Sequence, residues 1–187
     1  MSPTFNLPNA LTWFRILLIP IFVVVFWLPY EWARPLTGWI FALASVTDWL
    51  DGFLARRLEQ TSAFGAFLDP VADKLMVTTA LVLLVSADPD AGLTLAAAVI
   101  IGREIAVSGL REWMAELGAR HHVAVSPIGK IKTIVQLVAL IMMLYEEHLW
   151  FVPMYETGYW LLILAAVFTL WSMFKYLASA WPHLRGR

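Results

Sequence analysis

Six long apolar segments, separated by short polar connections, run through this chain from one end to the other. Their approximate bounds are 13–28, 38–54, 67–85, 93–113, 127–145 and 158–180. A bilayer core of about 30 Å needs an apolar helix of roughly 20 residues. With 60% hydrophobic residues and a mean hydropathy of +0.72, the chain is too apolar for a soluble globule. We therefore predict an all-α integral membrane protein, a bundle of six transmembrane helices in a single domain over 1–187.

Two proline-containing stretches qualify this prediction. Residues 1–12 mix Pro3, Pro8 and asparagines with apolar side chains, which favours an N-terminal segment lying in the membrane interface. No small-residue cleavage site of the kind recognised in signal peptides follows the first apolar segment, so we expect no signal peptide to be removed. Pro70 near the start of the third segment is expected to lie in the first turn of a helix, where its missing N–H costs nothing.

The distribution of lysine and arginine predicts the orientation in the membrane. The connections near 56–57 and 117–132 are basic, whereas 87–92 and 146–157 contain neither residue. Because basic connections remain in the cytoplasm, we expect both termini on the cytoplasmic side of a bacterial inner membrane. The ends of the second, fourth and sixth segments and the starts of the third and fifth then meet at that face.

Four aspartates stand between the second and third segments, at Asp48, Asp51, Asp69 and Asp73. Each carboxylate costs roughly 2.5–3.5 kcal/mol inside a membrane, so the group needs a partner. Within each pair the aspartates are three or four residues apart and share one face of a helix. Facing carboxylate pairs on antiparallel helices favour one or two hard cations, Mg²⁺ or Mn²⁺, with a phosphate-bearing substrate. The alternative, aspartates that only snorkel or pair with an arginine, fits four of them at these spacings poorly.

The complete pattern is Asp48-x2-Asp51-Gly52-x2-Ala55-Arg56-x8-Gly65-x3-Asp69-x3-Asp73. It resembles, without departure, the signature of the CDP-alcohol phosphotransferases, membrane enzymes that displace CMP from a CDP-linked lipid or alcohol. The resemblance implies that Asp48, Asp51 and Asp69 ligate two divalent metals. It further implies that Asp73 completes the metal site and acts as general base. The residues that it assigns to CDP-diacylglycerol are Gly52, Ala55, Arg56, Gly65 and Asn9.

Three other stretches, 6–15, 103–113 and 129–136, are similar to the bacterial phosphatidylglycerophosphate synthase branch of that family. The implied reaction joins CDP-diacylglycerol and sn-glycerol 3-phosphate to give phosphatidylglycerophosphate and CMP, a step of phospholipid biosynthesis. The resemblance covers most of the chain and weakens in the outer connections and after Tyr176.

Glycerol 3-phosphate is a dianion, so its pocket needs cations other than the metal. Arg111, Lys130 and Lys132 lie toward the predicted cytoplasmic ends of the fourth and fifth segments, and we expect them to bind this phosphate. Arg103 is a further candidate, with pairing to Glu104 as its alternative role. The alternative for all four basic residues is that they only set the membrane topology, as positive-inside residues, and bind no phosphate.

Two other functions remain open. A sibling enzyme would use serine, inositol phosphate or a second phosphatidylglycerol as acceptor, and the basic residues do not separate glycerol from inositol phosphate. A divalent-cation transporter would place its site near the midplane of repeated halves, and no repeat is visible. No nucleic-acid partner is expected. The small residues Ala96–Ala98, Ser108 and Gly109 are compatible with a homodimer interface and equally with internal packing.

Overall fold

The computed structural model describes residues 7–58, 63–116 and 127–185, with the side chains of most of them. Six helices follow one another in these ranges: α1 (Leu7–Phe26), α2 (Ala33–Leu58), α3 (Ala63–Ala87), α4 (Ala91–Glu116), α5 (Pro127–Tyr145) and α6 (Met154–Arg185). A short antiparallel hairpin, β1 (His148–Leu149) with β2 (Val152–Pro153), stands between α5 and α6. The predicted all-α membrane fold is confirmed.

Three helical segments among these residues are long and apolar enough to cross a bilayer: Phe67–Ala87, Ala91–Met114 and Met154–Phe174. Shorter apolar stretches form most of α1, at Ala10–Phe26, and of α5, at Ile131–Tyr145. Helix α2 is long, but its second half carries the first two aspartates of the signature. The acidic residues of the signature thus account for the more polar character of the second half of α2.

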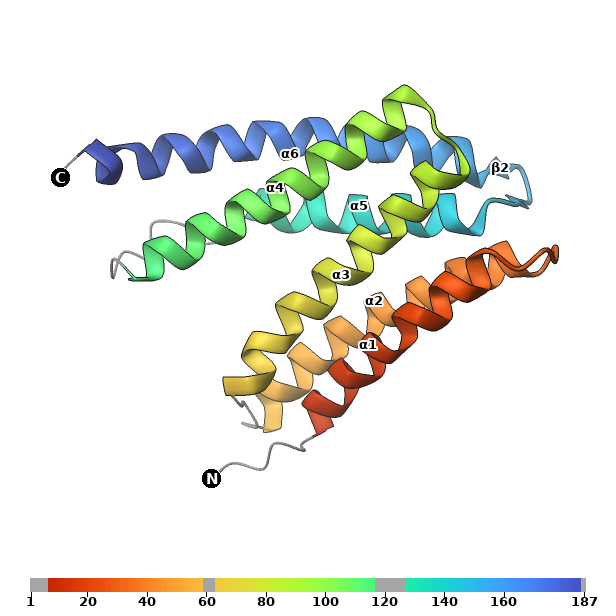
Figure 1. Cartoon of the computed structure of the whole chain (residues 1–187), viewed down its shortest axis with the longest axis horizontal. Helices are drawn as coiled ribbons and strands as arrows, with labels where there is room; N and C mark the ends of the chain where they lie inside the picture. Colours follow the sequence, from red (N-terminus) through yellow and green to blue (C-terminus); the bar gives the residue numbers. More distant parts are fainter. Residues whose placement is uncertain (1–6, 59–62, 117–126, 186–187) are drawn as a thin grey trace.

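The helices form two groups of three, α1–α3 and α4–α6, which lie together at one end and diverge toward the other (Figure 1). The hairpin marks the first end, called here the hairpin end. At the diverging end lie the last turns of α2, α4 and α6 and the first turns of α1, α3 and α5. The helix ends that were predicted to meet therefore lie at the same end of the bundle. At this end the two groups of helices are farther apart than at the hairpin end.

The core between the groups draws one or more fully buried apolar side chains from every helix. Those with no exposed surface include Phe22, Phe41, Leu81, Leu93, Leu140 and Leu162. Glycine allows two close contacts, because a Cβ on Gly38 would lie 3.0 Å from Tyr145 and one on Gly158 would lie 2.8 Å from the Ala139 carbonyl oxygen. These contacts bring α2 and α6 close to α5.

Helix α4 contains small residues that are buried and small residues with open space around them. Ala96 and Ala97 are buried at 3% and 5% exposure, so this part of the small-residue set packs inside the protein. A Cβ added at Gly102 or Gly109 would meet nothing within 4 Å. The internal-packing role is therefore observed for the two alanines.

Side-chain bonds at the hairpin end join α6 to the turn between α3 and α4. The Tyr155 hydroxyl donates to Asp88 at 2.6 Å, and the Tyr159 hydroxyl donates to Asp90 at 2.7 Å. Asp90 also accepts the backbone N–H of Leu93 at 2.9 Å as the cap of α4, and this bond lowers the pKa of its carboxyl. The turn predicted over 87–92 is thus held by hydrogen bonds from α6 and from the first turn of α4.

The observed bounds correct the sequence prediction in three places. Helix α3 begins at Ala63, so Pro70 is its eighth residue and not part of its first turn. Proline there leaves the Ala66 carbonyl without its helical N–H, which membrane helices tolerate when neighbours supply other donors. Helix α1 begins at Leu7, before the predicted start of the first apolar segment at residue 13, and residues 1–6 lie outside the described ranges. That the N-terminal segment lies in the membrane interface stays a prediction. The connection over 146–157 contains the unpredicted hairpin and the start of α6.

Candidate functional site

Two side chains of α1 reach the aspartates of the neighbouring helices. Arg15 donates from Nη1 to Oδ1 of Asp48 at 2.6 Å, and the Thr12 hydroxyl donates to Asp69. Both donors are buried, Arg15 at 1% exposure and Thr12 at 0%. They are three residues apart and so share one face of α1, while their acceptors belong to α2 and α3. Helix α1 therefore connects the two helices that carry the signature.

Three of the four predicted aspartates lie near one another. Asp48 of α2 is close enough to interact electrostatically with both Asp69 and Asp73 of α3. Gly65, one turn before Asp69, is buried. The side chain of Asp48 is 40% exposed, so this cluster of carboxylates can be reached from outside the protein.

The donor chemistry of this carboxylate cluster fits a hard divalent cation, since Mg²⁺ and Mn²⁺ prefer carboxylate oxygens. Within the described side chains, no three ligand-type groups already stand in a metal-holding arrangement. Asp48 and Asp69 bond instead to Arg15 and Thr12. Because a carboxylate offers about four lone-pair positions on two oxygens, these bonds leave acceptor positions for an ion.

Several predicted site residues lie in described helices but have side chains outside the described set. Their helices are α1 for residue 9, α2 for residues 51–56, α4 for residue 111 and α5 for residue 130. The residues are Asn9, Asp51, Gly52, Ala55, Arg56, Arg111 and Lys130. Their roles stay predictions.

Lys132 and Arg103 approach one another from α5 and α4. Lys132 is 4% exposed, and its Nζ has no hydrogen-bond partner among the described residues. It interacts electrostatically with Arg103 and Glu104. Arg103 donates to Glu104 at 2.5 Å, the pairing that the sequence offered as its alternative role. Glu104 in turn interacts with Asp73, so a series of charges runs from α4 and α5 to the carboxylate cluster.

A buried ammonium without a hydrogen-bond partner is costly, and an anionic ligand is one way to compensate it. Two of the four predicted phosphate-binding residues have described side chains, and of these Lys132 fits phosphate binding better than Arg103, which already bonds to Glu104. Glu104 thus lies between an acidic group of residues on α2 and α3 and the basic residue Lys132 on α5.

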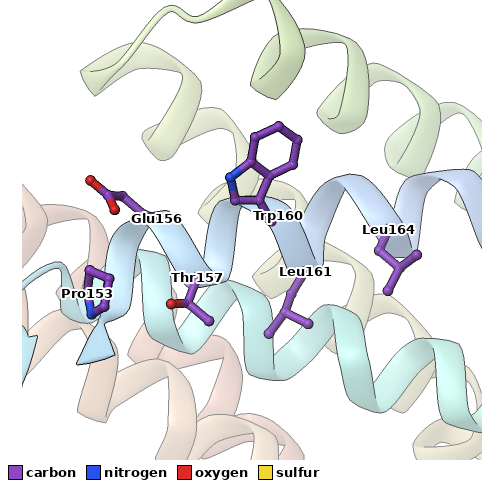
Figure 2. Close-up of a pocket in the computed structure, with 6 residues that line it drawn as sticks. All are labelled: Pro153, Glu156, Thr157, Trp160, Leu161 and Leu164. Carbon is purple, nitrogen blue, oxygen red and sulfur yellow. The ribbon is translucent and has the colours of Figure 1, made fainter. Parts of the chain in front are cut away.

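Two cavities in the described region lie elsewhere. One of about 430 Å³ runs along α6 at the hairpin end and is lined by Pro153, Glu156, Thr157, Trp160, Leu161 and Leu164 (Figure 2). Another of about 140 Å³ lies between α2, α5 and the hairpin. Neither is lined by an aspartate of the signature, so we place the candidate site at the carboxylate cluster and not at a cavity.

The sequence alone assigned no role to Thr12 or Arg15. A signal for Arg15 exists, because an arginine inside an apolar segment needs a partner and usually has a functional one. Thr12 carries no such signal, since a membrane helix satisfies a threonine hydroxyl with its own backbone. Its bond to Asp69 follows only from the packing of α1 against α3.

Comparison with known proteins gives this arrangement a context. The family described as CDP-alcohol phosphatidyltransferase matches residues 5–171. A protein of Pseudomonas fluorescens is 55% identical over 181 residues, 96% of this chain and 92% of the relative. Proteins of Salmonella paratyphi A and Escherichia coli K12 are 54% and 53% identical over 176 residues, 94% of this chain and 95% of each relative. All three relatives are named CDP-diacylglycerol–glycerol-3-phosphate 3-phosphatidyltransferase. This chain belongs to the CDP-alcohol phosphatidyltransferase family.

Proposed function

We propose that this protein transfers the phosphatidyl group of CDP-diacylglycerol to sn-glycerol 3-phosphate, giving phosphatidylglycerophosphate and CMP. Relatives over nearly the whole chain carry the name of this enzyme. The structural observation that supports the proposal is that Glu104 of α4 interacts electrostatically both with Lys132 of α5 and with Asp73 of α3. A reaction between an activated lipid and a phosphorylated alcohol needs both charges at one site.

The family generally depends on a divalent metal. Asp48, Asp51, Asp69 and Asp73 would hold one or two Mg²⁺ or Mn²⁺ ions, which when bound neutralise charge on the pyrophosphate of the lipid. Arg15 and Thr12 fix the positions of Asp48 and Asp69 through their hydrogen bonds. The residues proposed to hold the CDP group are Gly52, Ala55, Arg56, Gly65 and Asn9.

Asp73 is the proposed general base. Its carboxylate accepts the proton of a glycerol hydroxyl, and the oxygen attacks the phosphorus next to diacylglycerol in line with the leaving group. A new phosphorus–oxygen bond forms to glycerol, and the bond to CMP breaks. Most of the acceleration in this class of reaction comes from positioning and charge neutralisation.

The phosphate of the acceptor is the proposed ligand of the basic residues. Lys132 is the best supported of them, because its ammonium is buried without a hydrogen-bond partner in the part of the chain that the structure describes. Arg111 and Lys130 belong to the same two helices, and Arg103 stands beside Lys132 while bonded to Glu104.

The site and both termini are proposed to face the cytoplasm of a bacterial inner membrane. The first turn of α1 and the last turns of α6 lie at the diverging end of the bundle, with the helix ends next to the basic connections of the sequence (Figure 1). At this level the acyl chains of CDP-diacylglycerol remain in the bilayer while glycerol 3-phosphate enters from water.

The proposal is tested by comparing acceptors. The purified protein in lipid nanodiscs receives CDP-diacylglycerol, Mg²⁺ and, in separate reactions, labelled glycerol 3-phosphate, serine or inositol phosphate. We expect lipid-soluble label from glycerol 3-phosphate at a rate far above that from the other two. Transfer to serine or inositol phosphate at the higher rate would assign the chain to a different acceptor.

A further inference from the structure

The hairpin between α5 and α6 presents two aromatic side chains away from the protein. Trp150 is 88% exposed and Phe151 is 93% exposed, the two highest values among the exposed large apolar side chains that the structure describes. Leu149 pairs with Val152 across the two strands, so Trp150 and Phe151 form the tip of the hairpin. An exposed apolar tip of this kind marks a surface that contacts another apolar phase.

The position of the tip along the bundle is set by the helices beside it. Strand β2 ends at Pro153, and the apolar segment Met154–Phe174, long enough to cross a bilayer, begins at the next residue. The hairpin therefore leaves the protein where a membrane-spanning segment meets the bilayer surface, at the end opposite to the carboxylate cluster (Figure 1).

The backbone of the turn supports a specific role for these side chains. Trp150 has a φ of 59°, in the left-handed region that residues other than glycine and asparagine rarely adopt. A tight turn of this kind usually carries glycine or asparagine, which would remove an aromatic ring from the tip. The chain instead keeps tryptophan at the strained position, beside phenylalanine.

Other exposed aromatic side chains surround the hairpin end. Trp27, Tyr30, Trp32, Trp39 and Trp160 are all more than half exposed and belong to the connection between α1 and α2 or to the nearby turns of α2 and α6. Figure 2 shows the indole of Trp160 projecting from the surface of α6. Tryptophan and tyrosine concentrate at the level of lipid headgroups, where their rings lie in apolar surroundings and their polar atoms meet water. The tip therefore lies at the same end of the bundle as a set of exposed aromatic side chains of the kind found at headgroup level.

We propose that the Trp150–Phe151 tip inserts into the lipid headgroup region of the bilayer leaflet at the hairpin end and anchors the connection between α5 and α6 there. The occupant of this surface is the membrane itself, and the anchor fixes the depth of the two helices that it joins. This anchoring does not depend on the proposed reaction.

A cysteine scan tests the anchor directly, because the chain contains no cysteine. Phe151→Cys is labelled with an environment-sensitive fluorophore and the protein is reconstituted in phosphatidylcholine nanodiscs. Quenching is measured with lipids that carry a nitroxide high on the acyl chain and, separately, with iodide in water. Leu164→Cys, in the spanning part of α6, is the lipid reference, and Pro89→Cys, in the exposed acidic turn between α3 and α4, is the water reference.

We expect the label at residue 151 to be quenched by the lipid nitroxide nearly as strongly as the label at 164, and to be shielded from iodide several-fold relative to residue 89. Iodide access equal to that at residue 89 would overturn the anchor. Shielding from both quenchers would also overturn it, in favour of a second copy or a protein partner on the tip. Trp150→Cys, labelled in the same way, repeats the measurement from the neighbouring side chain if the first variant does not fold.

Discussion

Arg15 of α1 donates a hydrogen bond from Nη1 to Oδ1 of Asp48 on α2 at 2.6 Å, and its side chain is 1% exposed. The buried guanidinium of Arg15 thus bonds to a carboxylate, Asp48, that the signature assigns to metal binding. Ligands of a metal are oriented by the groups that bond to them, and loss of such a group typically costs about 10–100-fold in metal affinity or activity. Arg15 is therefore a positioning residue of the proposed site.

Arg15→Ala is expected to lower kcat on the order of 10–100-fold and to raise the Mg²⁺ concentration at half-maximal activity, because Asp48 loses the group that orients it. Arg15→Lys keeps the charge but not the planar fork, so it should recover only part of the activity. The measurement is a metal titration of the transfer rate in nanodiscs.

A matched control for this prediction is Arg34→Ala at the hairpin end. Arg34 pairs with Glu146 at 3.0 Å, but the pair is partly exposed and lies far along α2 from Asp48. Its removal should leave the metal dependence unchanged. An unchanged metal dependence in Arg15→Ala as well would remove the positioning role.

Asp73→Asn should fold and reach the membrane yet lose turnover by roughly 10²–10⁴-fold, since an amide cannot accept the hydroxyl proton. Two quantities are measured: the transfer rate, and the binding of Mn²⁺ as monitored by electron paramagnetic resonance. Retained Mn²⁺ binding with lost turnover separates a general base from a residue needed only for metal. Turnover at the wild-type rate would refute the role.

Lys132→Met should raise the KM for glycerol 3-phosphate roughly 10- to 100-fold, because a hydrogen bond to a charged group contributes about 1.5–3 kcal/mol. The KM for CDP-diacylglycerol should change little. Stability should be unchanged or improved, because an apolar side chain replaces a buried ammonium that has no hydrogen-bond partner among the described residues. A fall in the unfolding temperature with an unchanged acceptor KM would indicate a purely structural lysine.

Gly158→Ala is expected to destabilise the bundle by about 1–3 kcal/mol, because the new Cβ would lie 2.8 Å from the Ala139 carbonyl oxygen and force α6 from α5. Gly102→Ala in α4 is the matched control, since its Cβ would meet nothing within 4 Å. Alanine favours a helix over glycine by about 1 kcal/mol, so this control should be neutral or stabilising. Thermal unfolding in detergent compares the two, and equal effects would contradict the close packing.

The sequence predicts the helices well where polar connections are sharp, and α5 has the predicted bounds, Pro127–Tyr145. Other helices begin earlier or end later than predicted, because hydropathy marks the part of a helix that contacts lipid and not its polar end turns. Helix α2, for example, continues to Leu58 through the acidic stretch. The hairpin was not predicted, since strands of two residues offer no alternating pattern and Trp150 is no usual turn residue.

The signature could be read from the sequence because its spacings act within single helices. Asp69 and Asp73 share a face through helical geometry alone, whereas the bonds of Thr12 to Asp69 and of Arg15 to Asp48 join residues far apart in the chain. Such contacts depend on how α1 packs against α2 and α3, which hydropathy does not specify. The same holds for the approach of Lys132 to Glu104.

The most direct measurement of the central claim follows both products of one reaction. Purified protein in nanodiscs receives CDP-diacylglycerol, Mg²⁺ and labelled glycerol 3-phosphate, and released CMP and labelled lipid are quantified together. We predict equal amounts of the two products, with neither formed in the absence of a divalent cation and both reduced roughly 10²–10⁴-fold in the Asp73→Asn protein. CMP release without labelled lipid, or equal product formation in the Asp73→Asn protein, would contradict phosphatidyl transfer at the carboxylate cluster.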